Sequence, residues 1–160
     1  MKRIKFLIKL KGEEKLELVD PSKEVSESYL QKSESHFESG KILLNADKLE
    51  ESVSMFYYAM YHCLLALLFK CGIKSENHSG SILLLKELFN EENLFNKISF
   101  GKQERIDKQY YVSFRIVKQD CEKMMKNTEK FILNCKTLIG ELNQAKIDKI
   151  RDELKNALSG

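Results

Sequence analysis

The feature that most constrains this chain is an apolar run from Met55 to Phe69, interrupted only by His62. A bilayer span needs roughly twenty apolar residues, so a run of about fifteen is short for one. A helix that is apolar on nearly every side is typical of the centre of a bundle or of a subunit interface. We therefore predict a buried central helix from about residue 48 to 71, with no membrane association. Its main apolar row is Phe56, Met60, Leu64 and Leu67.

Composition favours a mostly helical domain. Of the 160 residues, 42% are apolar and 32% are charged, which is typical of a folded chain and excludes disorder. One proline and seven glycines are few breakers for an all-β protein, which needs a turn residue at every turn. The length is that of one domain with a single buried core.

Three patterns outline the helices around the apolar run. Asp20-Pro21-Ser22 is a helix start, and Ser33 and Gly40 on the following helix are small enough to let a neighbouring helix come close. Gly72 is placed to end the central helix. A heptad pattern predicts a long helix in a left-handed bundle seam, at Val117, Cys121, Met124, Thr128, Phe131, Cys135, Leu138 and Leu142.

The two ends of the chain are less regular. Alternation from Ile4 to Leu10 is typical of a strand in a hairpin with the "KLELV" segment, and a short helix followed by an extended segment fits almost as well. We predict an irregular connection over residues 90–101 and an amphipathic, detachable tail over 144–157. The predicted division is an N-terminal arm (1–21), a bundle (22–142) and a C-terminal helical tail (143–160).

Charge is distributed unevenly along the chain. Residues 1–15 hold six Lys or Arg against two Asp or Glu, and residues 97–136 hold ten against five, whereas residues 20–96 hold seven against twelve. A basic patch attracts nucleic acid or an acidic partner, although a solvated helix face is the commoner explanation. The N-terminal apolar stretch is broken by lysines and lacks a small-residue cleavage site, so we expect a cytoplasmic protein.

The cysteines and the standard motifs indicate little chemistry. There is no CxxC pair and no His-x-x-x-His, so we expect buried free thiols, no metal and no cofactor. The cysteines are Cys63, Cys71, Cys121 and Cys135. Walker, GxGxxG, HExxH and GxSxG signatures are absent, which leaves arrangements of single residues.

Two histidines have different surroundings in the sequence. His62 lies one turn after Tyr58 on the apolar helix, where a core histidine bonded to a tyrosine or a carbonyl is expected. His36 falls on an apolar row and is also assigned to packing. His78 stands in a predicted loop between Asn77 and Ser79, where a helix N-terminus offers free N–H groups to an anion such as phosphate.

A second candidate region places positive charge beside aromatic surface. Arg105 and Lys108 precede Tyr110 and Tyr111, a combination that suits a phosphate and a stacked base. The alternative is that the tyrosines pack and the cations are solvated. Together with residues 77–79, these side chains form the predicted nucleotide- or RNA-binding set.

Several segments resemble the HEPN domain superfamily (higher eukaryotes and prokaryotes nucleotide-binding), in its small prokaryotic branch. They are "SYLQKSESHFESGKILL", "EESVSMFYYAMYHCLLALLFKCGIKSENHSGSILLLKELF" and "RIDKQYY", and the resemblance covers roughly residues 22–135. It implies an all-α, up-and-down bundle of four to five helices, here with a short N-terminal hairpin or extended arm. It also implies frequent homodimers and a minimal nucleotidyltransferase partner in toxin–antitoxin pairs.

Many members of that superfamily are metal-independent ribonucleases with an arginine followed by a histidine. This chain departs from that motif, because the positions after Arg105 hold Tyr110, Tyr111 and Val112, and those after Arg115 hold Asp120, Cys121 and Glu122. What the resemblance transfers is Arg105, an aromatic companion at Tyr110 or Tyr111, and the loop histidine His78.

Two functions follow from these residues. The first is a non-catalytic homodimeric module that binds a nucleotidyltransferase, a nucleotide or both. The second is a ribonuclease toxin in which His78 replaces the missing base while Arg105 holds the scissile phosphate, which requires the two side chains to meet.

Overall fold

The computed structural model describes residues 2–110 and 115–160, without the side chains of residues 109 and 110. These residues form seven helices and a two-stranded sheet, so the all-α class is confirmed and the predicted count of four to five helices is not. The helices are α1 (Lys2–Gly12), α2 (Lys23–Asn45), α3 (Leu49–Lys70), α4 (His78–Glu87), α5 (Glu92–Tyr110), α6 (Lys118–Glu141) and α7 (Gln144–Leu158), and the strands are β1 (Leu16–Leu18) and β2 (Ile73–Ser75).

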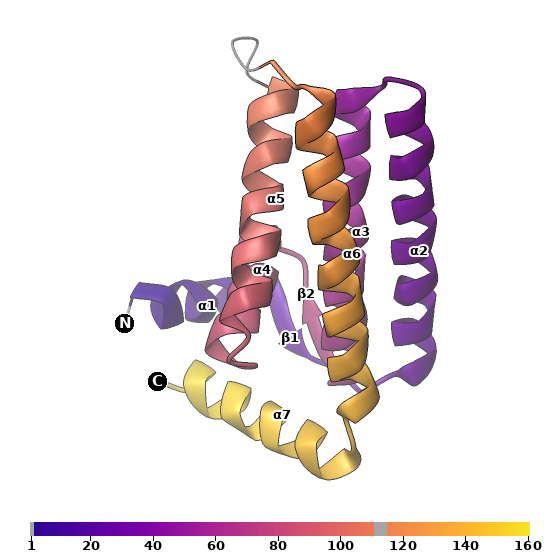
Figure 1. Cartoon of the computed structure of the whole chain (residues 1–160). Helices are drawn as coiled ribbons and strands as arrows, with labels where there is room; N and C mark the ends of the chain where they lie inside the picture. The colour runs from indigo at the N-terminus through magenta and orange to yellow at the C-terminus, as the bar shows by residue number, and fades with distance from the viewer. Residues whose placement is uncertain (1, 111–114) are drawn as a thin grey trace.

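The four long helices α2, α3, α5 and α6 stand side by side, and successive ones run in alternating directions (Figure 1). The shorter α1 and α7 lie across one end of these helices, where both chain termini are found. The sheet is also at this end, and it joins the N-terminal segment to the connection between α3 and α4.

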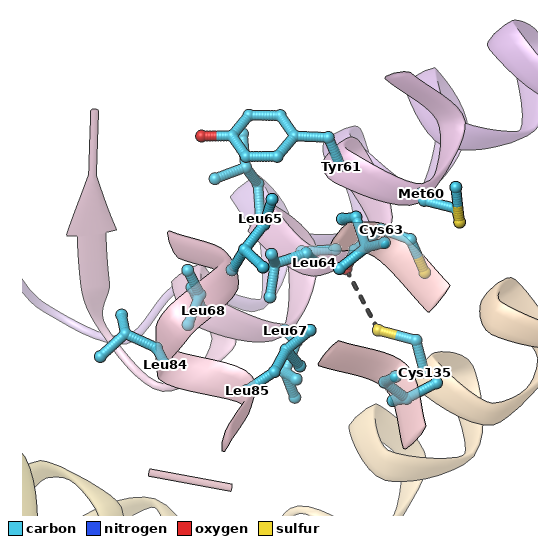
Figure 2. Packing of buried hydrophobic residues seen from close by; sticks show 14 of the residues in the cluster. Met60, Tyr61, Cys63, Leu64, Leu65, Leu67, Leu68, Leu84, Leu85 and Cys135 are labelled. Atoms are coloured by element: carbon cyan, nitrogen blue, oxygen red, sulfur yellow. Dashed lines mark hydrogen bonds between the residues drawn. The ribbon is translucent and has the colours of Figure 1, made fainter. Parts of the chain in front are cut away.

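The predicted central helix is confirmed. Phe56, Met60, Leu64 and Leu67 of α3 are all fully buried, and in Figure 2 leucines 64, 67 and 68 pack with Leu84 and Leu85 of α4. By length and hydropathy α3 would also pass as a membrane span, but 72% of the apolar window lies inside the protein, as in a core helix. Other helices of the same chain cover most of the surface of α3. The apolar surface of α3 therefore gives no reason to expect a dimer.

Helices α2 and α3 meet along a seam of small residues. The Ser26 and Ser33 hydroxyls of α2 donate to the α3 carbonyls of Ala66 and Ala59 at 2.7 and 2.6 Å. One heptad further on, Ser52 of α3 donates to the carbonyl of Gly40 at 2.8 Å. All three serines are buried, so side chain and backbone satisfy one another across the contact. The prediction that Ser33 and Gly40 allow close approach is confirmed.

The predicted heptad helix packs against α3 as α6. Five of its eight predicted positions are buried, and Val117, which caps the helix, is exposed. Cys135 donates from Sγ to the Cys63 carbonyl at 3.5 Å, the dashed line in Figure 2. All four cysteines are free and buried, as predicted. Burial raises the pKa of the Cys71 thiol to about 12, so that cysteine stays protonated.

Of the two alternatives predicted for the N-terminal segment, the hairpin is wrong. The first segment is helix α1, because Leu7 and Leu10 bury one helical face, and β1 pairs antiparallel with β2 instead, with Leu16 opposite Ser75 and Leu18 opposite Ile73. The alternative of a short helix followed by an extended segment matches. Gly72 ends α3 as predicted, in a left-handed conformation with φ of 69°.

The C-terminal helix α7 is attached to the end of the bundle that carries the sheet by hydrogen bonds from one arginine. Arg151 of α7 donates from Nη1 to the carbonyls of Val19, Cys71 and Gly72 at 2.7, 3.1 and 2.9 Å. Leu154 and Leu158 of the same helix are buried, so the tail contacts the core. The domain division at residues 21 and 142 stays a prediction.

The irregular connection predicted for residues 90–101 was also wrong. Helix α5 begins at Glu92, and Leu94 and Ile98, one turn apart, are buried on its inner face. Polar Asn93 and Asn96 had obscured this spacing. Because the helix begins early, Lys102 and Arg105 sit well inside it, on a surface fixed by packing.

The close contact between α2 and α3 predicts that a side chain at residue 40 would clash with α3. A Cβ atom there would lie 2.6 and 2.7 Å from Cε1 and Cδ1 of the fully buried Phe56 ring. We expect Gly40→Ala to lower the free energy of unfolding by about 1–3 kcal/mol, measured by urea denaturation. Gly140→Ala is the matched control, because nothing lies within 4 Å of the added Cβ inside α6. Its higher helix propensity should raise stability by about 0.5–1 kcal/mol, and equal effects of the two changes would contradict the seam.

Candidate functional site

His78 is the first residue of helix α4 rather than a loop residue, which corrects the sequence prediction. The Asn77 side chain caps the helix and accepts a hydrogen bond from the Gly80 N–H at 2.9 Å. Asn77 is thus occupied as a cap, in the way its residue type favours. This cap fixes the direction in which His78 and Ser79 leave the backbone.

His78 is half-buried against two tyrosines from consecutive turns of α3. Its ring stacks on Tyr61 at 3.8 Å between centroids, and its Nδ1 shares a hydrogen bond with the Tyr57 hydroxyl at 2.7 Å. Tyr57 is fully buried, and the Tyr61 hydroxyl is held by Ser81 at 3.2 Å. A loop histidine was expected, and the structure instead shows a helical one packed against Tyr57 and Tyr61.

Arg105 reaches the same tyrosines from helix α5. Its guanidinium carbon lies 5.2 Å from the Tyr57 ring centroid and 5.4 Å from that of Tyr58. Nη1 donates to the Tyr58 hydroxyl at 3.3 Å, while Nε is buried without a partner among the described residues. His78 and Arg105 therefore contact the same residue, Tyr57, from two different helices.

A second cation completes the cluster. Lys102, one turn before Arg105, donates from Nζ to the Ser79 hydroxyl at 2.5 Å. Burial and the neighbouring Arg105 lower the pKa of Lys102, and burial with both cations lowers the pKa of His78. We call His78, Lys102 and Arg105, with Tyr57, Tyr58 and Tyr61, the candidate site.

The direction of the hydrogen bond between His78 and Tyr57 sets the tautomer of the imidazole. The tautomer decides whether Nε2 can donate or accept a hydrogen bond. Burial raises the pKa of Tyr57, so the phenol keeps its proton. If Tyr57 donates to Nδ1, the neutral ring carries N–H at Nε2 and can donate to a phosphate oxygen. If Nδ1–H donates to the phenol oxygen instead, Nε2 has a free lone pair and can act as a base. Nε2 makes no hydrogen bond with any described residue.

One of the predicted residues is not part of this cluster, and two others lie outside what the structure describes. Lys108 is turned toward α6, where Nζ lies 3.4 Å from the Arg115 carbonyl and 3.7 Å from an Asp120 carboxylate oxygen. The side chain of Tyr110, and Tyr111 entirely, lie outside the described residues. Of the predicted set, the structure thus brings His78, Ser79 and Arg105 together.

A row of stacked rings extends from the candidate site along the α2–α3 edge. His62 stacks on His36 at 4.7 Å and on Tyr29 at 5.8 Å, and Tyr29 stacks on Phe69 at 5.3 Å. His62 is half-buried, so its packing role matches the prediction. Nδ1 is buried and has no partner in good hydrogen-bond geometry among the described residues, although the Tyr58 backbone one turn earlier interacts with the ring and raises its pKa.

Sequence reasoning missed Lys102 and the three tyrosines as site residues. The tyrosines were counted only as part of the apolar run of the central helix, yet each has a hydroxyl that must find a partner when buried. The signal in the sequence was the grouping of three tyrosines at positions 57, 58 and 61, shortly before the NHSG segment. No group of three metal-ligating side chains occurs in the part of the chain that the structure describes.

Comparison with known proteins places this geometry in a family. The model of the HEPN domain matches residues 26–155, which includes every residue of the candidate site. The chain belongs to the HEPN domain family. The matched region also extends past residue 142 into α7, beyond the bundle boundary predicted from the sequence.

Two relatives fit the small prokaryotic HEPN branch. The chain is 26% identical over 132 residues to the Methanocaldococcus jannaschii protein named "Putative toxin MJ0142", covering 75% of this chain and 90% of that one. It is 39% identical over 56 residues to the Pyrococcus horikoshii "UPF0332 protein PH1297", covering 35% of this chain and 39% of that one.

The contact between His78 and Tyr57 predicts measurable coupling. We expect Tyr57→Phe and His78→Ala each to destabilise the fold, because each strands a buried polar partner. The double variant should lose less than the sum, with a coupling free energy of about 0.5–1.5 kcal/mol by urea denaturation. Tyr29→Phe combined with His78→Ala is the control, since no contact joins that pair, and should be additive. Additivity in both cycles would contradict the contact.

The buried position of His62 in the row of stacked rings predicts that the protein loses stability in acid. Burial, His36 and Lys32 lower the pKa of His62 from 6.5 to about 4, and an interaction with the Tyr58 backbone opposes this only in part. The unfolded chain therefore binds a proton that the folded chain does not, and the free energy of unfolding falls as pH drops from about 6.5 toward about 4.

We expect His62→Phe, which keeps a ring in the stack, to make this acid dependence shallower in urea titrations between those pH values. Tyr29→Phe also keeps a ring in the stack and leaves His62 in place, so it should keep the wild-type slope. A wild-type slope in His62→Phe would show that His62 does not titrate as inferred.

Proposed function

We propose that this HEPN protein is one member of a toxin–antitoxin-like pair and that its candidate site binds the phosphate of a nucleotide or of RNA. The observation that carries the proposal is the concentration of positive charge at the site. Lys102 and Arg105 lie one turn apart on α5, and neither forms an ion pair with a described carboxylate. Burial first, and then the charge of Arg105, lowers the pKa of Lys102. A bound anion would relieve this repulsion.

The geometry suits a phosphate in three ways. Arg105 carries a planar fork of donors that matches phosphate oxygens, and its position over two tyrosine rings pre-orients that fork. Lys102 adds a point charge beside a hydroxyl donor, Ser79. In one tautomer, His78 adds a third donor.

We further propose that the protein acts as a homodimer and binds a minimal nucleotidyltransferase in the cytoplasm. Membership of the HEPN family and the toxin name of the M. jannaschii relative support a paired system. Ile42 of α2 and Leu133 of α6 are each 65% exposed, and apolar side chains with this exposure are available to a partner.

The site favours binding over catalysis, because the histidine of the usual ribonuclease motif is replaced by tyrosine and valine at residues 110–112. One observation favours the alternative, a metal-independent ribonuclease. His78 and Arg105 contact the same tyrosine, so a general base and a phosphate-binding group occur together. In that reaction Nε2 of His78 would take the proton of a 2′-hydroxyl as it attacks the phosphate.

The positive charge of the candidate site predicts that Lys102 contributes to RNA binding. We expect Lys102→Ala to weaken binding of a fluorescein-labelled single-stranded RNA by roughly tenfold in anisotropy titrations, with a shallower dependence on salt, because one phosphate contact is lost. Arg105→Lys should also weaken binding, since the charge remains but the fork is lost. RNA incubated with the wild type without added metal should stay intact.

Lys146→Ala is the matched control, because it removes the same charge from an exposed residue of α7. Equal weakening by Lys102→Ala and Lys146→Ala would show that only net charge attracts RNA, and the proposed site would be wrong. Cleavage by the wild type that is lost in Arg105→Lys, with binding retained, would establish the ribonuclease instead.

A further inference from the structure

A cavity of about 340 Å³ lies between helices α1, α4 and α5, next to the candidate site. Its walls are mainly apolar and come from all three helices: Phe6 of α1, Ile82 and Leu83 of α4, and Phe95 and Ile106 of α5. Its volume falls in the range of sites that hold small organic ligands, roughly 300–1,000 Å³.

The cavity and the candidate site share a wall. Lys102 and Ser79 both line the cavity, and their side chains are joined by the 2.5 Å hydrogen bond. Lys102 also interacts electrostatically with Arg105 and with His78. A ligand in the cavity would thus have an apolar, aromatic environment at one end and the charged cluster at the other.

Two polar residues interrupt the apolar walls. Ser99 and Gln103 of α5 line the cavity on the same helical face as Lys102 and Ile106. Gln103 donates from Nε2 to Asp107 at 2.7 Å, which leaves its carbonyl oxygen as an acceptor. A purely aliphatic ligand would leave both groups unpaired, whereas the edge of a nucleobase offers donors and acceptors.

We propose that this cavity holds the base and sugar of a nucleoside 5′-monophosphate whose phosphate lies at Lys102 and Arg105. The inference rests on the proposed function, which supplies the phosphate site, and it selects a mononucleotide as the ligand. Phe6 and Phe95 provide ring surface for the base, and stacking on an aromatic side chain tolerates any base. Phe6 comes from α1, so the N-terminal arm takes part in binding.

The test is calorimetric titration of the full chain with AMP, UMP, ribose 5-phosphate and octyl phosphate. We expect AMP or UMP to bind about tenfold more tightly than ribose 5-phosphate, because stacking of one base strengthens binding by roughly five- to a hundredfold. Ile106→Trp fills the cavity and should abolish this advantage, because AMP and UMP then bind no more tightly than ribose 5-phosphate. Phe6→Leu keeps apolar volume without the ring and should reduce the advantage several-fold.

The control is Phe100→Leu, which removes a ring from a part of α5 that does not line this cavity. It should bind AMP and UMP like the wild type. Circular dichroism melts establish that each variant is folded, and Phe6→Leu provides the test by itself if Ile106→Trp does not fold.

The outcomes separate the inference from the proposed function. Binding of AMP and UMP no tighter than ribose 5-phosphate, with all three lost in Lys102→Ala, would overturn the base pocket and leave the phosphate site standing. Octyl phosphate binding as tightly as AMP, in a manner sensitive to Ile106→Trp, would assign the cavity to aliphatic ligands and overturn the inference. Failure of every phosphate to bind would overturn both.

Discussion

The rest of the structure depends on the close contact between helices α2 and α3. Ser26, Ser33 and Gly40 recur every seven residues on α2 and face Ala66, Ala59 and Ser52, which recur every seven residues on α3. Antiparallel helices with matching seven-residue repeats keep the same faces together along their whole length. The small side chains let the backbones approach, and the serine hydroxyls bond carbonyls of the opposing helix. The contact therefore fixes both the distance between the helices and the rotation of α3 about its axis.

That rotation places the candidate site. Successive residues of a helix are about 100° apart, so with Ala59 facing α2, Tyr57 and Tyr61 point to the opposite side, where α4 brings His78. Tyr58 and His62 fall at the edge of the seam, where Tyr58 accepts from Arg105 of α5 and His62 stacks on His36 of α2. The YYAMYH segment thus directs Tyr57 and Tyr61 toward α4, and Tyr58 and His62 toward the edge of the seam. A bulkier residue in the seam would disturb both groups by shifting or turning α3.

Periodicity predicted the helices whose burial is strong, and it did not identify side-chain partners. The apolar run of α3, the glycine at its end and the heptads of α6 were readable because burial repeats along each segment. Helix α1 was obscured because alternating lysines resemble a strand, and only its contacts in the fold bury Leu7 and Leu10.

Among the site residues, His78 and Arg105 were found by residue type and resemblance. Lys102 and the tyrosines were not, because their role arises from contacts between residues far apart in the sequence, such as Tyr58 with Arg105. Lys108 has a similar sequence context to Arg105, but the helix turns it toward α6.

The electrostatics of the candidate site couple ligand charge to the protonation of His78. Burial comes first among the causes that lower its pKa, and the positive charges of Arg105 and Lys102 follow. A phosphate bound between the two cations would offset their charge and accept a hydrogen bond from the imidazole, so the pKa of His78 would rise in the complex. Binding of the anion would then be accompanied by proton uptake at a pH between the free and bound values, and it would strengthen as pH falls through that window. The same protonation removes the lone pair that a general base needs. A site arranged in this way holds phosphate best in the state in which His78 is least able to cleave RNA, which is a physical reason to regard the cluster as a binding site.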